Sequence, residues 1–295
     1  MIITNNSNLP LPIYNAIIAN PYTRGDSDIS VTDLIDSPRI SALKLEHDED
    51  ITTDASDLVA SLLGQAMHTV LERGGAKSVE GESETRLYST IEGWRVSGQF
   101  DYLDKDGVIW DWKFVSVQEY IRGVKVSRET QLNLYAALAR RNNIQITGLR
   151  IGFVFRDYSQ WGASKDPYYP KAQAIEVPIT LWDADVAEEY LVERVRLHQA
   201  ARSASAPADL QPCTPEERWA TPEQWAVYKN ANKKASKLFT SENDAEHFAA
   251  ALRATYLKDK YKVVHRPGGN TRCERFCYVL RWCEQGKELV YGSNT

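Results

Sequence analysis

Cysteine is scarce in this chain of 295 residues, and several common sequence features are missing altogether. No apolar run approaches the roughly 20 residues that a membrane-spanning helix needs, so we expect no membrane span. Residues 1–6 lack the basic and apolar regions of a signal peptide, which predicts a cytoplasmic protein. No Gly-x-x-x-x-Gly-Lys-Ser/Thr motif is present, which excludes a P-loop ATPase motor within the chain.

The charge is distributed unevenly along the chain. The net charge of −5 does not by itself favour nucleic-acid binding. Residues 1–60 carry ten acids against three bases, whereas thirteen bases face eight acids between Cys213 and Cys283, a local net charge of +5. This asymmetry is typical of a protein with one polyanion-facing part, and equally of lysine-rich solvated helices.

The order of predicted elements indicates an α/β fold with a C-terminal lobe. We expect an irregular arm over residues 1–30, one core over 31–202, and a helical lobe over 203–295 that begins at the small, flexible segment 203–209. Ser127 is expected to cap one of the helices. Apolar spacing predicts helices over 54–73, 127–141 and 183–201. We also expect a short helix that starts at Thr32 and is limited by Pro38, and helices near 222–238 and 241–256. Strands are predicted three times between 85 and 115, and again over 146–155 and 174–179.

A tight turn at 104–107 predicts a β-hairpin that carries opposed acids. If the turn is centred there, Asp101 lies opposite Asp111 across the two strands. Asp111 and Lys113 then share one face, because side chains alternate along a strand. Like charges directly opposite weaken a sheet, so a divalent cation is expected to hold these carboxylates. The alternative is a solvated hairpin face with incidental charges.

A helix before this hairpin carries a histidine. Gly64 and His68 lie one turn apart on that helix, and a glycine lets a ligand or another backbone approach closely. A lone histidine is more often a satisfied core or surface residue than a metal ligand, so the helix alone does not decide the role of His68.

Four short motifs in order give the chain a family resemblance over residues 30–155. They are Gly64-x-x-x-His68, Gly98-x-x-Asp101, Asp111-x-Lys113 and Gln131-x-x-x-Tyr135. The set resembles the RecB-like branch of the PD-(D/E)xK nuclease superfamily. The resemblance implies a restriction-endonuclease-like core, which is a mixed central sheet flanked by helices.

The same resemblance assigns roles to these residues. It implies that Mg²⁺ or Mn²⁺ is held by His68, Asp101, Asp111 and the main-chain carbonyl of Trp112. Lys113 would position or help deprotonate the attacking water. On the next helix, Gln131 and Tyr135 would contact DNA or brace the site, although simple helix packing explains these two residues as well.

All four cysteines lie in the C-terminal lobe, at Cys213, Cys273, Cys277 and Cys283. Reduced thiols at this spacing indicate a metal site, and the spacing alone leaves zinc, iron–sulfur and structural cysteines open. The chain resembles iron–sulfur nucleases of the RecB-like group, which implies a 4Fe-4S cluster on these four cysteines. The chain departs from those nucleases in two ways. Its three C-terminal cysteines are separated by three and then five residues, where that group commonly shows two and then five. The group's fourth cysteine normally lies near the N-terminus, where this chain has Ser37.

We therefore expect a metal-dependent deoxyribonuclease, an exonuclease of stand-alone, phage-related type. By resemblance it would hydrolyse DNA ends or single strands in replication, recombination or repair, with a helicase or recombination protein as partner. The alternative is a DNA-binding or recombination-assembly protein with a nuclease fold and little cleavage. Aromatic residues of the C-terminal lobe would either shield the cluster or stack unpaired bases.

Overall fold

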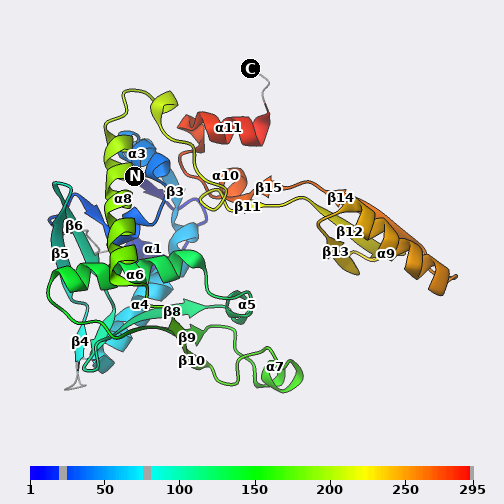
Figure 1. Cartoon of the computed structure of the whole chain (residues 1–295), viewed down its shortest axis with the longest axis horizontal. Helices are drawn as coiled ribbons and strands as arrows, with labels where there is room; N and C mark the ends of the chain where they lie inside the picture. Colours follow the sequence, from blue (N-terminus) through cyan, green and yellow to red (C-terminus); the bar gives the residue numbers. More distant parts are fainter. Residues whose placement is uncertain (20–24, 76–80, 293–295) are drawn as a thin grey trace. The chain divides into compact units, whose positions relative to one another are not determined.

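The computed structural model describes residues 1–19, 25–75 and 81–292 (Figure 1). The chain divides into two compact units, Met1–Ala204 and Ser205–Thr295. The first unit combines sheets and helices, and the second contains all four cysteines. Within the described residues, every helix is too short or too polar to cross a membrane.

A five-stranded mixed sheet forms the centre of the first unit, in the order β10-β9-β8-β7-β4. Its strands are β4 (Gly81–Ser83), β7 (Tyr102–Asp104), β8 (Val108–Val115), β9 (Gly148–Phe155) and β10 (Ala174–Ile179). Strands β8 and β9 pair in parallel, and the other neighbours pair antiparallel. The parallel pair requires a crossover connection, which here contains two helices. This mixed sheet with flanking helices confirms the expected fold class.

Two smaller sheets complete the β-structure of this unit. One has the order β2-β6-β5 and the other pairs β1 with β3 in parallel. These strands are β1 (Ile2–Thr4), β2 (Ile29–Ser30), β3 (Thr52–Asp54), β5 (Arg86–Ile91) and β6 (Trp94–Gln99). The prediction of an irregular arm over residues 1–30 was wrong, because β1, β2 and helix α1 (Leu11–Ile18) lie there. Pro10 and Pro12 occupy the start of α1, where the missing N–H is not required.

The helices of the first unit follow the predicted segments in part. Besides α1, they are α2 (Val31–Leu34), α3 (Pro38–Glu46), α4 (Val59–Gly75), α5 (Val117–Ile121), α6 (Val126–Arg141), α7 (Gln160–Lys165) and α8 (Ala184–Arg202). Among them α2, α4, α6 and α8 overlap the predicted segments, whereas α1, α3, α5 and α7 were not predicted. The buried Ser37 accepts a hydrogen bond from the Ile40 N–H and caps α3, with Pro38 at its first position. Ser127 is not the cap of α6, because Lys125 precedes the helix and makes no side-chain capping bond.

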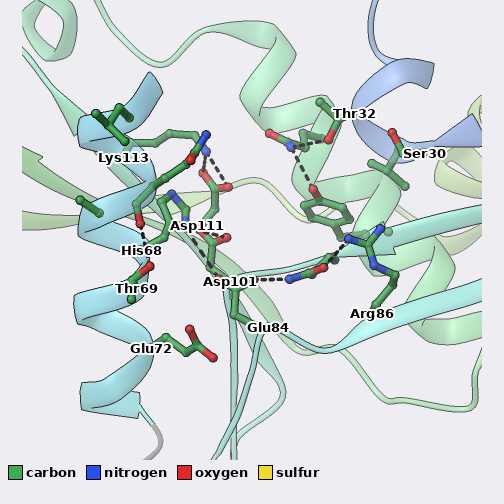
Figure 2. A pocket seen from close by; sticks show the side chains of 18 of the residues that line it. Ser30, Thr32, His68, Thr69, Glu72, Glu84, Arg86, Asp101, Asp111 and Lys113 are labelled. Carbon is green, nitrogen blue, oxygen red and sulfur yellow. Dashed lines mark hydrogen bonds and ion pairs between the residues drawn. The ribbon is translucent and has the colours of Figure 1, made fainter. Parts of the chain in front are cut away.

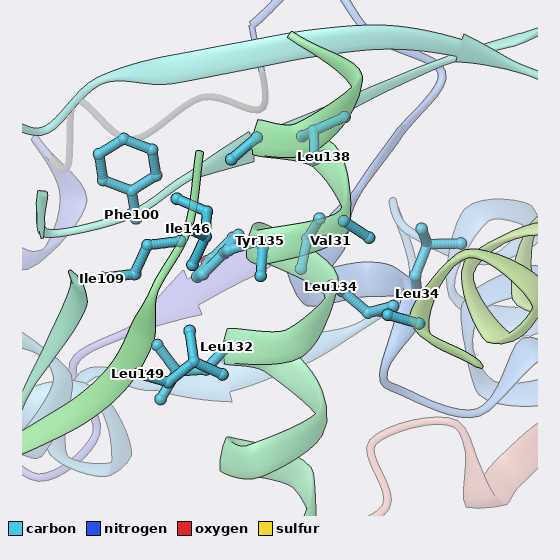
Figure 3. Packing of buried hydrophobic residues seen from close by; sticks show 14 of the residues in the cluster. Val31, Leu34, Phe100, Ile109, Leu132, Leu134, Tyr135, Leu138, Ile146 and Leu149 are labelled. Atoms are coloured by element: carbon cyan, nitrogen blue, oxygen red, sulfur yellow. The ribbon is translucent and has the colours of Figure 1, made fainter. Parts of the chain in front are cut away.

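Helix α6 is the central element of the hydrophobic core. Most of its residues from Thr130 to Ala139 are buried, which is typical of a helix enclosed on several sides. Figure 3 shows its side chains packed among residues of the sheets and of α2. The labelled residues are Val31, Leu34, Phe100, Ile109, Leu132, Leu134, Tyr135, Leu138, Ile146 and Leu149. Burial of this apolar surface fixes the helix against the strands that carry the predicted site.

The second unit contains a three-stranded antiparallel sheet, β13-β12-β14, and a β11-β15 pair. Its strands are β11 (Ala220–Thr221), β12 (Gln224–Lys229), β13 (Lys237–Phe239), β14 (Tyr261–Arg266) and β15 (Gly269–Asn270). Its helices are α9 (Glu242–Thr255), α10 (Thr271–Arg275) and α11 (Glu284–Tyr291). The prediction of a helix over 222–238 was therefore wrong, and the lobe is not purely helical. Helix α9 lies within the predicted segment 241–256.

Helix α8 holds the loop between α2 and α3 through Arg194 and carries the buried His198 one turn further along. Arg194 donates hydrogen bonds to the carbonyls of Leu34 and Asp36, at 2.8 and 2.5 Å. The Nε2 atom of His198 has no hydrogen-bond partner among the described residues. Burial, together with the charge of Arg194, lowers the pKa of His198 from 6.5 to about 4.

We predict that acid destabilises the protein through His198. Between pH 6.5 and 4 the unfolded chain binds more protons at this position than the folded chain, so stability falls as the pH drops through that range. The loss at His198 reaches at most about 3 kcal/mol. The measurement is the free energy of unfolding by urea at pH 7.5 and pH 5. His198→Asn, which does not titrate, should show a smaller loss, and an equal loss in both proteins would contradict the assignment.

Candidate functional site

One long hairpin brings Glu84 opposite Asp101. Its tight turn is Glu92-Gly93, and pairing runs from Ile91 with Trp94 to Arg86 with Gln99. The same register resumes where β4 pairs with β7. Between these two paired stretches the Glu84 N–H donates to the Asp101 carbonyl at 3.1 Å. The hairpin thus leaves one sheet and enters the other at these two acids.

A second hairpin brings Asp111 opposite Asp101 from the other side. Tyr102 pairs with Trp110, so the register aligns Asp101 with Asp111, as predicted from the sequence. The Asp101 carboxylate accepts a 2.6 Å hydrogen bond from the Trp112 N–H, which fixes the two strands together. In the turn, the Asp104 carboxylate accepts from the backbone N–H groups of Asp106 and Val108.

The two faces of β8 differ as the alternation predicts. On one face the rings of Trp110 and Trp112 stack with centroids 5.5 Å apart. On the other, Lys113 Nζ lies 2.7 Å from Asp111 Oδ1 and 2.6 Å from Oδ2, and it donates a hydrogen bond to Oδ1. The Asp111 carboxylate is buried, and its Oδ2 atom accepts no hydrogen bond from the described residues. Burial raises the pKa of Asp111, although the charge of Lys113 opposes this rise.

Three ligand-type side chains gather beside this ion pair. His68, from α4, lies with its Nδ1 atom 3.3 Å from Asp101 Oδ1 and 3.9 Å from Glu84 Oε1. One ligand atom from each of the three lies within 4.8 Å of the others. The hydrogen bond to Asp101 raises the pKa of His68, and burial raises the pKa of Glu84.

Glu84 was missed by the sequence analysis. A count across the Glu92-Gly93 turn would have found it, since Glu84 is as far before that turn as Asp101 is after it. Its backbone φ of +54° lies in the left-handed region, which glycine adopts freely and glutamate adopts rarely. Such strain is concentrated at functional sites.

The candidate site opens into a cavity of about 700 Å³ (Figure 2). Gln131 and Tyr135 from α6 line it, and the Gln131 amide donates to the Tyr135 hydroxyl at 2.9 Å. Arg86 donates to Gln99 at 2.6 Å, and Gln99 in turn donates to Glu84. Sequence-predicted His68, Asp101, Asp111, Lys113, Gln131 and Tyr135 all line the cavity. That the main-chain carbonyl of Trp112 joins the metal ligands stays a prediction.

The donor set fits a hard divalent cation. Carboxylate oxygens, which dominate this donor set, suit Mg²⁺ and Mn²⁺, while the single imidazole of His68 is a ligand that Zn²⁺ and Fe²⁺ also accept. Asp111 Oδ2 is buried and accepts no hydrogen bond from the described residues, but the Lys113 ammonium lies 2.6 Å away and already offsets its charge. Glu84 extends the ligand set that the sequence suggested.

A second candidate site lies in the Ser205–Thr295 unit. Cys213, Cys273 and Cys283 are buried and Cys277 is half-buried, and none of the four forms a disulfide. Burial and the neighbouring Cys213 and Cys283 raise the pKa of the Cys273 thiol. Burial also raises the pKa of Cys277, which has Cys273 and Cys283 as neighbours. Cys273 therefore lies near Cys213 and Cys283, and Cys277 near Cys273 and Cys283, although among the described residues no three of the four sulfur atoms lie within 4.8 Å of one another.

Backbone groups and one amide hold these cysteines in place. The Cys213 N–H donates to Gln285 Oε1 at 2.8 Å, and Gln285 Nε2 donates back to the Cys213 carbonyl at 3.1 Å. The Gly286 N–H donates to Cys283 Sγ at 3.3 Å, and the backbone of Val279 hydrogen bonds to Cys277. Hydrogen bonds to sulfur stabilise thiolates and tune the metal centres that they bind.

Comparisons with known proteins give no family assignment. No family model and no curated protein matches this sequence. Among solved structures, SSO0001 aligns at 17% identity and a TM-score of 0.45, over 63% of this chain and 85% of that one. A candidate exonuclease from Eubacterium rectale aligns at 12% identity and a TM-score of 0.33, over 63% of this chain and 70% of that one. A phage-related exonuclease from Haemophilus somnus aligns at 13% identity and a TM-score of 0.30, over 65% of this chain and 77% of that one.

Proposed function

We propose that this chain is a metal-dependent DNA nuclease that acts as an exonuclease on DNA ends or single strands. The observation that carries the proposal is one cavity in which His68, Glu84 and Asp101 lie beside the buried Asp111–Lys113 pair. Phosphodiester hydrolysis requires an activated water and stabilisation of negative charge on the phosphate. These side chains can serve both requirements. Two of the neighbours reported above carry the name exonuclease, in agreement with this proposal.

His68, Glu84, Asp101 and Asp111 would hold Mg²⁺ or Mn²⁺, joined by the Trp112 carbonyl. A bound divalent ion lowers the pKa of water and offsets negative charge on a phosphate. The protein contributes the fixed positions of the carboxylates, because hairpin register and the Trp112 N–H hold Asp101. His68 Nδ1 faces Asp101, which orients the imidazole ring.

Lys113 would hold an ammonium group beside the scissile phosphate. Its Nζ atom contacts both oxygens of Asp111, so the charge is fixed in position before DNA arrives. A preorganised charge of this kind stabilises a transition state without reorganisation during the reaction. The intact pair favours an enzyme over an assembly protein with a nuclease fold, since a binding surface has no need of a buried, costly carboxylate.

The shape of the cavity favours a single strand. Its volume of about 700 Å³ is in the range of small-molecule pockets, which suits a short stretch of one strand better than a duplex. Gln131 and Tyr135 would contact that strand or brace the site. Since the chain has no Walker motif, strand separation would come from a helicase or recombination partner.

The four cysteines would bind a 4Fe-4S cluster. A cubane cluster attaches each of four thiolates to a different iron, and a tetrahedral zinc also accepts four thiolates. The resemblance of the chain to iron–sulfur nucleases of the RecB-like group favours the cluster.

Removal of the ion pair should abolish cleavage of DNA. We expect Asp111→Asn and Lys113→Ala each to reduce the rate on end-labelled single-stranded DNA with Mg²⁺ or Mn²⁺ by at least about 100-fold. Asp106→Asn and Lys105→Ala, in the turn of the same hairpin, are matched controls that should retain the rate. Unchanged cleavage in Asp111→Asn and Lys113→Ala would contradict the site assignment.

Substitution of Glu84 should lower the affinity for metal without lowering the stability of the metal-free protein. We expect Glu84→Gln to bind Mn²⁺ at least about tenfold more weakly in calorimetry, because one of the charged oxygens near His68 and Asp101 is removed. The thermal unfolding temperature without metal should not fall, since burial already disfavours the charged form of Glu84. Equal Mn²⁺ affinity of the variant and the original protein would exclude Glu84 as a ligand.

Anaerobically purified protein should contain about four iron and four sulfide per chain. Cys283→Ser should lose most of the iron, since Cys283 would be one of four thiolate ligands. Ser37→Ala, at a buried serine of the first unit, should retain it. The measurement is elemental analysis with visible absorption spectroscopy. A colourless protein with one zinc per chain would refute the cluster.

A further inference from the structure

Residues 222–268 form a small ββαβ module between Cys213 and Cys273. Strands β12, β13 and β14 make its sheet, and α9 packs on one face. Pairing of β11 with β15 closes the module at its two ends. Its own small core contains Trp225, Val227, Phe239, Ala245, Phe248, Ala249, Leu252, Tyr261 and Val263. Neither the metal site in the cavity nor the cysteine site uses this module.

The second face of the module's sheet carries no helix within the module. Strand alternation and the register place seven residues on it, namely Gln224, Ala226, Tyr228, Leu238, Lys262, Val264 and Arg266. We call these seven residues the open face; six of them are exposed or partly exposed, and Ala226 is fully buried. Leu238 is 43% exposed and Val264 36%, although both are apolar. Scattered apolar residues are common on protein surfaces, but here they adjoin an aromatic ring and two bases.

Tyr228 lies between two cations on the open face. Lys262 pairs directly with it, and the Lys262 Nζ atom lies 5.8 Å from the ring centroid. The Arg266 guanidinium lies 5.5 Å from the same centroid and donates a hydrogen bond to the Tyr228 hydroxyl. The open face therefore combines a ring, apolar side chains and positive charge, and it contains no acid.

The module is positively charged overall, and its open face carries bases without acids. Nine bases face five acids in residues 222–268, a net charge of +4 in a chain of net charge −5. Three of the five acids, Glu242, Asp244 and Glu246, lie on α9, which covers the opposite face. The β12–β13 connection adds the exposed bases Lys233 and Lys234. A polyanion complements this distribution of charge.

We infer that the open face binds single-stranded DNA. This inference rests on the proposed nuclease function for the identity of the polyanion. Unpaired bases present flat apolar surfaces that can contact Tyr228, Leu238 and Val264, while Lys262 and Arg266 contact phosphates. A duplex keeps its bases stacked inside and offers mainly phosphates to a flat sheet, so it gains little from the exposed apolar residues. The residues of this face belong to the second unit, whereas those that line the cavity belong to the first.

The test is fluorescence anisotropy of labelled oligo(dT) with the full-length chain in EDTA, so that cleavage does not contribute. We expect tighter binding of oligo(dT) than of a hairpin duplex of equal length. Lys262→Glu with Arg266→Glu should weaken oligo(dT) binding at least about tenfold and reduce its salt dependence. Lys165→Glu with Lys287→Glu makes the same change in charge at exposed positions outside the module, and it should weaken binding by no more than about threefold.

A second pair of variants separates stacking from charge. Tyr228→Leu should weaken oligo(dT) binding about tenfold, whereas Tyr228→Phe, which keeps the ring, should retain it. Thermal unfolding of each variant verifies folding. Equal weakening by both charge-reversed pairs, or a preference for duplex or for an acidic protein over oligo(dT), would overturn the inference.

The two proposals fail in different ways. If the Lys262→Glu, Arg266→Glu protein cleaves DNA and binds oligo(dT) with unchanged affinity, the proposal that the open face binds DNA is wrong, while the proposed nuclease function stands. If oligo(dT) binds at the open face but no metal-dependent cleavage occurs, the proposed DNA binding is supported and the proposed nuclease function is refuted.

Discussion

Three carboxylates meet in this protein because two hairpins share one strand. Glu84 lies opposite Asp101 across the first hairpin, and Asp111 lies opposite it across the second. Like charges placed opposite one another destabilise a sheet. The structure offsets this repulsion with His68 from α4 and with Lys113 two residues from Asp111. The divalent cation that we propose would supply the remaining positive charge.

The rest of the first unit supports that arrangement. The parallel β8–β9 pair anchors the strand that carries Asp111 and Lys113 in the middle of the sheet. Helix α6, enclosed in the core, closes the cavity with Tyr135, which is only 6% exposed. Gly98 allows this closeness, since a Cβ atom there would lie 3.0 Å from the Tyr135 ring. Packing in the core and geometry in the cavity thus depend on the same helix.

Much of this site could be predicted from the sequence, because strand alternation and tight turns act locally. A turn at 104–107 is enough to align Asp101 with Asp111. To find Glu84, residues must be counted in the same way across the Glu92-Gly93 turn. Its position opposite Asp101 also depends on a hairpin whose pairing passes from one sheet (β5 with β6) to another (β4 with β7). The error over residues 222–238 is of a different kind: a helix was predicted there, although Trp225, Val227 and Tyr228 favour strands. Tertiary contacts of β14 with β12 decided the outcome.

The central claim is that a divalent cation binds between the opposed carboxylates. Anomalous diffraction from crystals soaked in Mn²⁺ tests it most directly. The account predicts an anomalous peak within coordination distance of Asp101, with His68, Glu84 or Asp111 as further ligands. A fully occupied Mn²⁺ elsewhere, with no peak in this cavity, would contradict it.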